Sequence, residues 1–483
     1  MKANNIYEFE FIGGKLKYYI DENGDAVIID YVGENEILCI PMDLGWLSEK
    51  YDTSIPVANY IPDESFQSCT KVKTVIFGID MKLGLFLFTN CDNLSTVVSI
   101  DSSIDYDEFS FTKKNYAPQN IKTFELITTS YGDDYIVSAL SEGRELATQG
   151  GVPVVMFIDG ELYSVTYLRE KQNSDYFYDK YGIAEEDLVV VSENVLDEGT
   201  EAGYLDYKEL IKLLNEKDAS DPLVYEEICK RMDVQSFIDF MTVNLYCNNI
   251  DISLGKNMRL WRSRTGGGEG YLDGRWRFAL YDTDAVAWAY YVRTDTDFLE
   301  TDPFRWTLDS DKYPKGDQKY IIIPFFENLL KNESFREQFV LTYLDIANET
   351  FGINGSGKRI LDSIGEGDNA FVLSLLEKRA PYAIGFLKYA LDITGENCSV
   401  CIKADNPKAG RIKVNTVIAD TEDGEWNGEY ISGYSVTLTA IPEEGYMFAG
   451  WEGDVSSTEE SLTVDLTEAG LTLEAVFEKE GGN

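Results

Sequence analysis

Four side chains in the middle of the chain have types and a spacing that could support phosphoryl transfer. Asp251 and Asn257 lie six residues apart in the stretch NNIDISLGKNMRLW, and Asp282 and Asp284 lie in the later stretch YDTD. In that reaction one carboxylate orients the attacking hydroxyl, while an amide oxygen and another carboxylate hold Mg²⁺ against the nucleotide phosphates. Asn and Asp are also common in turns and helix caps, so the spacing alone leaves a purely structural role open.

The elements expected around these residues would bring them to one edge of a short sheet. Asp233 is predicted to cap a helix over VQSFIDFMTVNLYC. From Asn257 onward, the β-like runs NMRLWR and RWRFALYD flank a glycine-rich stretch that we interpret as a hairpin tip, because a phosphate-binding loop would be followed by a helix. The order helix, loop, hairpin therefore predicts that Asp251 and Asp282 converge on one cleft. The helix has apolar residues at helical spacing on one face, which we expect to be core: Val234, Phe237, Ile238, Met241 and Leu245.

Local signals predict further elements on both sides of this region. Asp159-Gly160 between two apolar runs predicts a β-hairpin, and Asn173 or Ser174 is expected to cap the helix that follows it. Asp221-Pro222 is expected to begin another helix, and a helical pattern covers residues 320–350. The central region is thus expected to be mixed helix and sheet.

The composition excludes several classes of function. The 483 residues include 85 Asp and Glu against 42 Lys and Arg, which gives a formal net charge of −43 and disfavours nucleic acid as a partner. The sequence contains no histidine, which excludes catalysis by a Ser-His-Asp triad and any His-ligated metal site. We expect no transmembrane segment, because no run approaches 18 apolar residues. The N-terminal stretch MKANNIYEFEF lacks the apolar segment of a signal peptide, so an exported protein would have lost its signal.

Two stretches near the N-terminus repeat with a shift of 22 residues. FQSCTKVKTVIF begins at Phe66 and FTNCDNLSTVVS begins at Phe88, so that Phe, Cys and Val recur at matching offsets. A period in the low twenties is typical of leucine-rich solenoids. The segment resembles the BspA-like leucine-rich repeats of bacterial surface proteins. We expect residues 1–103 to form this repeat-like part and residues 104–121 to be a linker.

After Asn397 apolar and polar residues alternate between turns, which indicates a small all-β module over residues 396–480. Its run GYSVTLTAIPEEGYMFAGW resembles the divergent internalin-B-type repeats of bacterial surface proteins. The predicted fold class is therefore multidomain α+β, with an N-terminal solenoid, a central domain over residues 122–394 and this C-terminal β module.

The central domain resembles the CotH family of atypical, secreted protein kinases, named for a spore-coat protein. The resemblance rests on four blocks in the family's order, which are VVMFIDGELYSVTYLREKQNSDYFYDKYGI, DVQSFIDFMTVNLYCNNIDISLGKNMRLWR, GRWRFALYDTDAVAW and PFFENLLKNESFREQFVLTYLDIANETFG. It implies a divergent kinase-like fold that uses ATP with Mg²⁺ or Mn²⁺ to phosphorylate an exported or surface protein. With the acidic charge of the chain, a Ser-rich, basic protein substrate is expected. The implied location is extracellular or on the bacterial cell surface, with attachment to the cell envelope.

The resemblance also implies roles for single residues. Asp251 would be the catalytic base, and Asn257, Asp282 and Asp284 would bind metal. Arg169 and Glu170, at the end of the predicted hairpin, would contact the cofactor: Arg169 through a phosphate, and Glu170 through a cation or a basic side chain. Ion pairing with each other or with neighbouring residues is an equal alternative for these two.

Two alternatives remain. A metal-dependent glycosyltransferase would explain the D-x-D of Asp282 and Asp284, but it would not explain Asp251 and Asn257. A surface adhesion or scaffolding protein with a degenerate kinase core would explain a departure from the family's pattern. The family's usual Arg-rich run before a Gly-Asp pair is here Ile127-Thr128-Thr129-Ser130.

Overall fold

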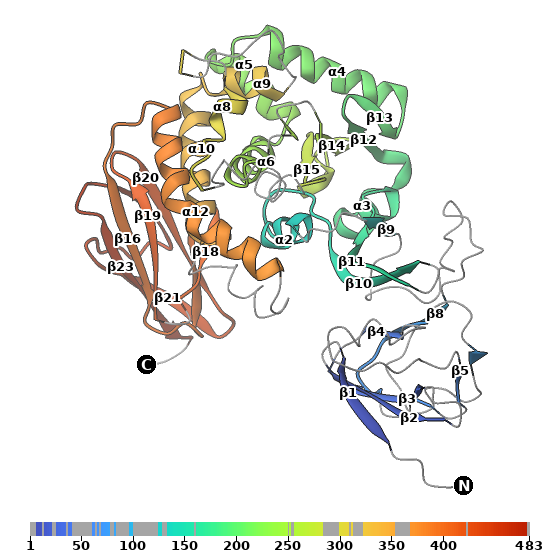
Figure 1. The fold of residues 1–483 in the computed structure, drawn as a ribbon. Coiled ribbons are helices and arrows are strands. Elements are labelled where there is room, and N and C mark those ends of the chain that lie inside the picture. Colours follow the sequence, from blue (N-terminus) through green and yellow to red (C-terminus); the bar gives the residue numbers. More distant parts are fainter. Residues whose placement is uncertain are drawn as a thin grey trace. The chain divides into compact units, whose positions relative to one another are not determined.

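The chain divides into two compact units, each described here by itself (Figure 1). One comprises Met1–Ser130 with Gly151–Lys171, and the other comprises Tyr131–Gly150 with Gln172–Asn483. None of the helices among the described residues is long and apolar enough to cross a membrane. The computed structural model describes residues 6–11, 14–21, 26–34, 37–40, 60–62, 65–66, 69–77, 82–83, 96–99, 124–127, 133–158, 161–249, 251–252, 256–283, 299–308, 311–312, 322–352, 368–421 and 424–480.

The first unit begins with an antiparallel meander of β1 (Tyr7–Phe11), β2 (Gly14–Ile20) and β3 (Ala26–Gly33). Two sets of parallel strands follow. One set is β4 (Ile37–Ile40), β6 (Thr74–Phe77) and β8 (Thr96–Ser99), and the other is β5 (Tyr60–Ile61) with β7 (Lys82–Leu83).

The parallel register agrees with the 22-residue shift of the sequence. Thr74 lies opposite Thr96, and Val75 lies opposite Val97. Phe66 is buried, whereas its partner in the repeat, Phe88, lies outside the described residues. The antiparallel meander has no counterpart in the repeat, so the leucine-rich solenoid stays a prediction.

The first unit also contains a three-stranded antiparallel sheet in the order β10-β11-β9. Its strands are β9 (Phe124–Ile127), β10 (Gly151–Ile158) and β11 (Glu161–Glu170). The pairing of β10 with β11 confirms the predicted hairpin, whose turn lies outside the described residues.

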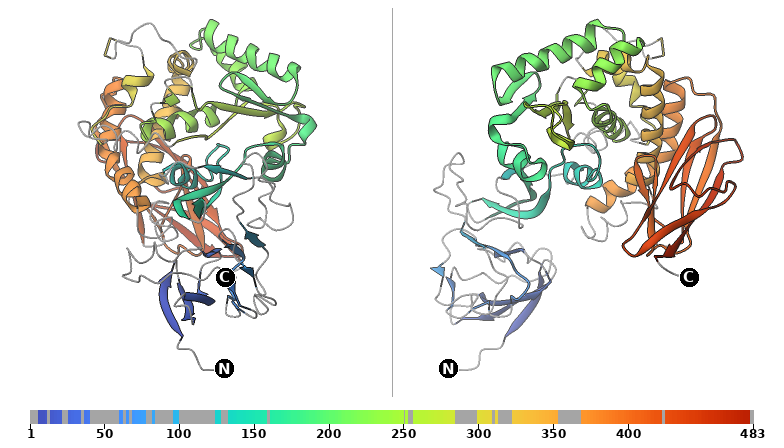
Figure 2. Two further views of the ribbon diagram at one scale, coloured as in Figure 1. Left: turned by 45° about the vertical axis from the view of Figure 1, so that its right-hand side comes forward. Right: turned by 180° about the vertical axis from the view of Figure 1, so that it is seen from behind.

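The second unit begins with helices around a four-stranded antiparallel sheet in the order β13-β12-β14-β15 (Figures 1 and 2). The cap residues predicted from sequence are confirmed, since Asn173, Asp221 and Asp233 each accept a hydrogen bond from the first turn of their helix. The elements of this part are α2 (Asp133–Leu140), α3 (Ser174–Tyr181), the 3₁₀ helix η2 (Glu185–Asp187), β12 (Leu188–Ser192), β13 (Val195–Glu198), α4 (Glu201–Glu216), α5 (Pro222–Arg231), α6 (Val234–Tyr246), β14 (Arg259–Ser263), the 3₁₀ helix η4 (Gly270–Leu272), β15 (Arg277–Ala279), α8 (Phe304–Thr307), α9 (Ile322–Leu329), α10 (Glu333–Asp345), the π-helix η5 (Ile346–Thr350) and α12 (Asp368–Ala390).

The C-terminal part of the second unit is all β, as predicted from the alternation of the sequence. It forms two four-stranded sheets, in the orders β19-β16-β23-β21 and β18-β17-β20-β22. One hydrophobic core runs from the central helices into this module without a break and includes both Phe240 and Trp426. The strands are β16 (Asn397–Ala404), β17 (Gly410–Val414), β18 (Val417–Ala419), β19 (Glu425–Ile431), β20 (Ser435–Pro442), β21 (Tyr446–Gly453), β22 (Ser461–Asp465) and β23 (Leu471–Lys479).

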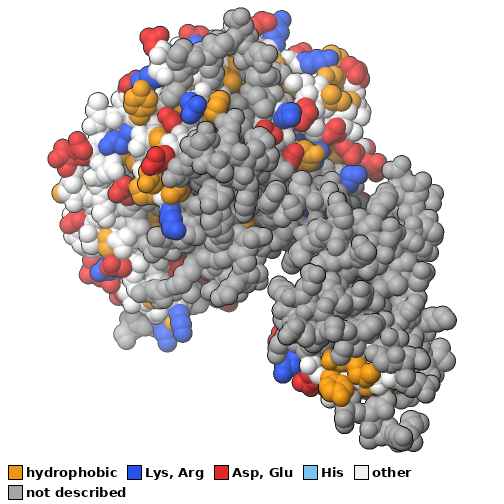
Figure 3. All heavy atoms as spheres, viewed as in Figure 1, with side chains coloured by type: hydrophobic (Ala, Val, Ile, Leu, Met, Phe, Trp, Pro, Cys, Tyr) orange, Lys and Arg blue, Asp and Glu red, His pale blue; other side chains and the backbone are white. Residues whose placement is uncertain are grey.

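The surface reflects the acidic composition. On the face shown in Figure 3, acidic side chains of the described residues are interspersed with Lys and Arg. On this face the acidic side chains of the described residues do not gather into one patch, which favours general solvation as their role there.

Candidate active site

Helix α6 is the central support of the candidate site. Every residue of α6 except Gln235 is buried, so the helix is enclosed by other elements (Figure 2). Its apolar residues exclude water, and its polar residues find hydrogen-bond partners inside the protein, as buried polar groups must. A helix held in this way gives the residues that follow it a fixed starting point.

A chain of amide contacts ties the loop after α6 to the helix itself. Asn248 takes a left-handed backbone conformation, with φ of 53°, and the chain leaves the helix there. The backbone N–H of Asn249 donates to the carbonyl of Asn244 at 2.8 Å, and its side-chain Nδ2 donates to Asn244 Oδ1 at 2.9 Å. Asn249 Oδ1 then accepts the N–H of Asp251 at 3.3 Å. The half-buried Asp251 is therefore positioned through Asn249 and Asn244.

Asn257 joins this loop to the far end of the β14–β15 hairpin. Lys256 N–H donates to the carbonyl of Asp251 at 3.3 Å. Asn257 is 3 % exposed and has a φ of 58°, a conformation that Asn tolerates better than most residues. Its Nδ2 donates to the carbonyl of Asp282 at 2.7 Å. That hydrogen bond identifies Oδ1 as the atom of the amide that can bind a cation.

Asp282 lies three residues beyond the end of β15. Its φ is 53°, and its side chain is exposed, whereas the neighbouring Leu280 and Thr283 are buried. The carbonyl of Asp282 accepts the hydrogen bond from Asn257 Nδ2. An amide oxygen and a carboxylate thus come from two strand ends, which is the type of donor set that suits Mg²⁺.

Of the remaining residues predicted for the site, the structure describes Arg169 and Glu170. Asp284 lies outside the described residues. Arg169 and Glu170 are both buried in β11 of the first unit, where they lie opposite Glu125 and Phe124 of β9. Within the described ranges, no group of three or more His, Cys, Asp or Glu side chains could hold a metal ion.

Glu193 supports the site and has no motif that would have revealed it from sequence. It lies in the turn between β12 and β13, where both Glu193 and Asn194 have positive φ, as in a type I′ hairpin turn. Its Oε1 accepts the backbone N–H of Asn257 at 3.2 Å. The turn signal of the stretch SEN was visible in the sequence, but the contact is made across 64 residues.

The guanidinium of Arg259, the first residue of β14, lies beside the residues between β15 and Asp282. It lies over the ring of Tyr281, with 4.2 Å from Cζ to the ring centroid. It donates to Ser192 Oγ at 2.8 Å and to Gln172 Oε1 at 3.2 Å, while Gln172 Nε2 donates to the carbonyl of Leu280 at 3.2 Å. This network fixes the end of β15 on which Asp282 depends.

Two cationic clusters hold the ends of α6. Arg379 is fully buried, which lowers its pKa, and it donates to the carbonyl of Tyr246 at 2.6 Å and to that of Thr301 at 2.9 Å. At the other end, Arg277 contacts the cap residue Asp233 at 3.3 Å and Asp273 at 2.8 Å. Burial opposes ionisation of Asp273, but hydrogen bonds from Arg277 and Arg275 outweigh it and lower the pKa of Asp273 to about 2.

Comparison with known families finds two matches along the chain. Residues 131–362 match the family described as CotH kinase protein, and residues 414–481 match the Divergent InlB B-repeat domain. No curated protein matches the chain. Neither match covers the N-terminal segment predicted to be a leucine-rich repeat. Asp251, Asn257 and Asp282 all fall within the first match. The two resemblances predicted for the central and C-terminal parts are confirmed: the chain has a central CotH domain, which supports a kinase-like function, and a C-terminal all-β module.

Proposed function

We propose that this protein is an atypical Ser/Thr protein kinase of CotH type, which transfers phosphate from ATP to an exported or surface protein. The observation that carries the proposal is the hydrogen bond from Asn257 to the carbonyl of Asp282. It joins the loop that carries Asp251 to the strand end that carries Asp282, in the order that kinase chemistry uses.

The proposed chemistry assigns one step to each group. The substrate hydroxyl attacks the γ-phosphorus of ATP, the bond from that phosphorus to the β,γ-bridging oxygen breaks, and ADP leaves. Asp251 would accept the hydroxyl proton. Asn257 Oδ1 and the carboxylate of Asp282 would hold Mg²⁺ or Mn²⁺, which neutralises phosphate charge when bound.

Three further residues have proposed roles that extend this core. Asp284 would bind a second metal ion or orient Asp282. Arg169 would neutralise a phosphate, and Glu170 would position a cation or a basic side chain, as the helix Glu of a kinase does. The burial of Arg169 and Glu170 supports a fixed orientation for both side chains.

The proposed substrate is a Ser-rich, basic protein on or outside the bacterial cell. The net charge of −43 supports a basic partner, since it attracts positive surfaces at low ionic strength. The InlB-type module supports a surface location. The N-terminal segment, if it forms the predicted repeats, would recruit the substrate or attach the protein to the envelope.

The test combines binding with transfer. ATP is titrated into the full-length protein by calorimetry with and without Mg²⁺, and labelled γ-phosphate is then followed into a basic, Ser-rich peptide. Mg²⁺-dependent binding together with phosphoserine supports the proposal. Absence of both at saturating Mg²⁺ and Mn²⁺ would overturn it, and consumption of a nucleotide-sugar instead would identify a glycosyltransferase.

A degenerate scaffold is the second candidate, and it has one observation in its favour. The family's Arg-rich run is replaced by Ile127–Ser130, and Ile127 is the last residue of β9. Fewer cations beside the phosphates would weaken transition-state stabilisation. A scaffold would neither bind ATP nor transfer phosphate in this test, and it would retain only protein binding.

A further inference from the structure

The carboxylate of Asp345 is the centre of the contact between the central domain and the C-terminal module. Asp345 is the last residue of α10 and is fully buried. Its Oδ1 accepts hydrogen bonds from Asn415 Nδ2 at 2.9 Å and from the Tyr430 hydroxyl at 2.7 Å. Its Oδ2 accepts the backbone N–H of Thr416 at 3.0 Å and the Thr416 hydroxyl at 2.6 Å. All four donors belong to the module.

The orientation of these donors is fixed within the module. Asn415 Oδ1 accepts the backbone N–H of Thr437 at 2.8 Å, so its Nδ2 must face Asp345. Burial raises the pKa of Asp345, while the four donors favour the carboxylate and oppose that rise. Such a group is costly to leave without its partners, which makes the contact specific.

The π-helix η5 adds a second set of contacts to the module. Trp426 Nε1 donates to Glu349 Oε2 at 2.9 Å, and both side chains are buried. Asn348 and Glu429 exchange two hydrogen bonds: Asn348 Nδ2 donates to the Glu429 carbonyl at 2.9 Å, and Glu429 N–H donates to Asn348 Oδ1 at 2.8 Å. A tethered spacer would require neither the buried Trp426–Glu349 contact nor the reciprocal pair of Asn348 and Glu429.

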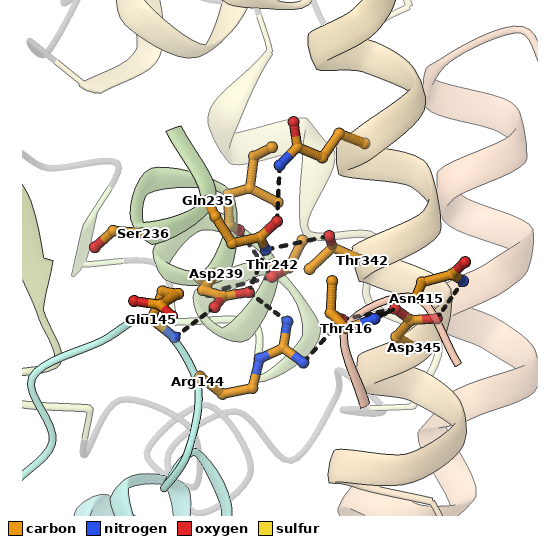
Figure 4. A network of polar contacts seen from close by, with 12 residues as sticks. Arg144, Glu145, Gln235, Ser236, Asp239, Thr242, Thr342, Asp345, Asn415 and Thr416 are labelled. Carbon is orange, nitrogen blue, oxygen red and sulfur yellow. Dashed lines mark hydrogen bonds and ion pairs between the residues drawn. The ribbon is translucent and has the colours of Figure 1, made fainter. Parts of the chain in front are cut away.

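Thr416 extends the Asp345 contact to α6. Its Oγ1 accepts a hydrogen bond from Arg144 Nη1 at 3.1 Å while it donates to Asp345 (Figure 4). Arg144 Nη2 pairs with Asp239 Oδ1 in the middle of α6. Asp239 is further held by the N–H of Glu145 at 2.8 Å. One guanidinium thus bridges the module and the helix that supports the candidate active site.

The end of α6 also contacts the π-helix side of the interface. The ring of Tyr246, the last residue of α6, stacks on Phe351 with centroids 4.8 Å apart and an angle of 8° between the planes. Phe351 directly follows η5, whose residues Asn348 and Glu349 contact the module. Both the middle and the end of α6 are therefore connected to the module, and Asp251 lies five residues after Tyr246.

We infer that the C-terminal β module is a positioning element of the candidate active site, and that Arg144 and Thr416 are the positioning residues through which it acts on α6. The kinetic part of this inference rests on the proposed function. The structural part, that the module orders the loop after α6, holds whether or not the protein transfers phosphate.

The test uses full-length variants in matched pairs. Thr416→Val removes the hydroxyl between Arg144 and Asp345. Its control is Thr439→Val in the same module, which removes a hydroxyl paired with Ser461 Oγ at 3.3 Å. Arg144→Lys keeps a positive charge beside Asp239. A lysine has one ammonium group in place of the two guanidinium nitrogens, so it cannot contact Thr416 at the same time.

Two readouts are made on each variant. In Thr416→Val and Arg144→Lys, kcat for phosphoryl transfer falls about tenfold with the KM for ATP unchanged, because a shift of the loop misaligns the proton acceptor without removing the nucleotide contacts. Amide exchange in the peptide over residues 240–252 becomes at least about fivefold faster. In the double variant the two losses are less than additive, since both act through one contact.

The kcat values test the kinetic part of the inference, and amide exchange tests its structural part. Equal kcat in Thr416→Val and Thr439→Val, or faster exchange confined to the module, would overturn the inference. If the unmutated protein transfers no phosphate, the proposed function fails. Amide hydrogen exchange in residues 240–252 still decides whether the module orders the loop after α6.

Discussion

The side-chain amide of Asn257 donates a 2.7 Å hydrogen bond to the backbone carbonyl of Asp282, 25 residues along the chain. The nitrogen of this amide therefore holds the strand end, and its oxygen is the atom proposed to bind a cation. A change at Asn257 affects both the shape of the site and its donor set. Substitutions at Asp251 and Asp282 separate the proposed chemical roles without disturbing this hydrogen bond.

Asp251→Asn is expected to leave nucleotide binding intact and to lower kcat by about 10² to 10⁴. The proposed base acts on the attacking hydroxyl in the transition state, whereas Asn257 and Asp282 are the proposed metal ligands. Calorimetry with ATP and Mg²⁺ and single-turnover kinetics measure the two effects. Asp392→Asn, at a carboxylate whose side chain is 82 % exposed, is the control. Loss of ATP affinity in Asp251→Asn would show that Asp251 is a binding residue instead.

Asp282→Asn is expected to weaken Mg²⁺-dependent ATP binding by at least about tenfold, which is about 1.4 kcal/mol. Asn is preferred to Ala here because Asp282 has a φ of 53°, and Asn accepts this left-handed conformation while Ala is strained in it. The hydrogen bond to the Asp282 carbonyl is kept in the variant, so only the charge is lost. Binding measured without Mg²⁺ is the internal control, and an equal loss without metal would argue against a metal ligand.

Asp345→Asn is expected to destabilise the second unit by about 1–3 kcal/mol. Each carboxylate oxygen of Asp345 accepts a nitrogen donor, Asn415 Nδ2 on one and Thr416 N–H on the other. An amide in either orientation would turn its NH₂ group toward one of them and leave a buried donor without an acceptor. Urea unfolding measures the loss. The matched control is Asp465→Asn in the same module, where the exposed carboxylate accepts only the Ser435 hydroxyl, and a change within about 0.5 kcal/mol is expected.

Asp273→Asn is expected to change the pH dependence of stability in a defined direction. Hydrogen bonds from Arg277 and Arg275 lower the pKa of Asp273 to about 2, so its carboxylate stabilises the native state above the unfolded pKa near 4, and this is lost as the pH falls through 2. The difference in unfolding free energy between unmutated protein and variant should be at most about 2 kcal/mol at pH 6, and it should shrink toward pH 2. A difference that is constant over this range would show that the stabilisation is not electrostatic.

Local signals allowed much of the fold to be predicted from sequence. Asp233 and Asn173 cap their helices as expected because a cap involves only the next three residues, and the β14–β15 hairpin follows from alternation within one short stretch. The prediction that the apolar face of α6 belongs to the core was also correct. The sequence did not reveal that the opposite face is buried as well, since Asp239 on that face depends on Arg144, 95 residues earlier.

The sequence singled out Asn257 and Asp282 as candidate site residues, but it did not single out the residues that support them. Asn257 and Asp282 carry side chains whose chemistry is visible in the sequence, and the structure joins them. Glu193 and Arg379 act through backbone groups of distant residues, and such contacts leave no pattern in residue types. The bridge from Arg144 to Thr416 spans 272 residues, and only the tertiary structure brings them together.

The continuous core that joins the central helices to the β module also sets an order for biosynthesis. A ribosome synthesises Asp345 and Glu349 well before it reaches Trp426 and Tyr430, which bury their carboxylates. Until the strands of the module have been translated, two acidic side chains of the nascent chain lack their native hydrogen-bond donors. The apolar surface that packs against the module is then also exposed to solvent. The native contacts of these two carboxylates can therefore be completed only after β19 has been translated, and a premature stop codon before Trp426 would remove the donors Trp426 and Tyr430.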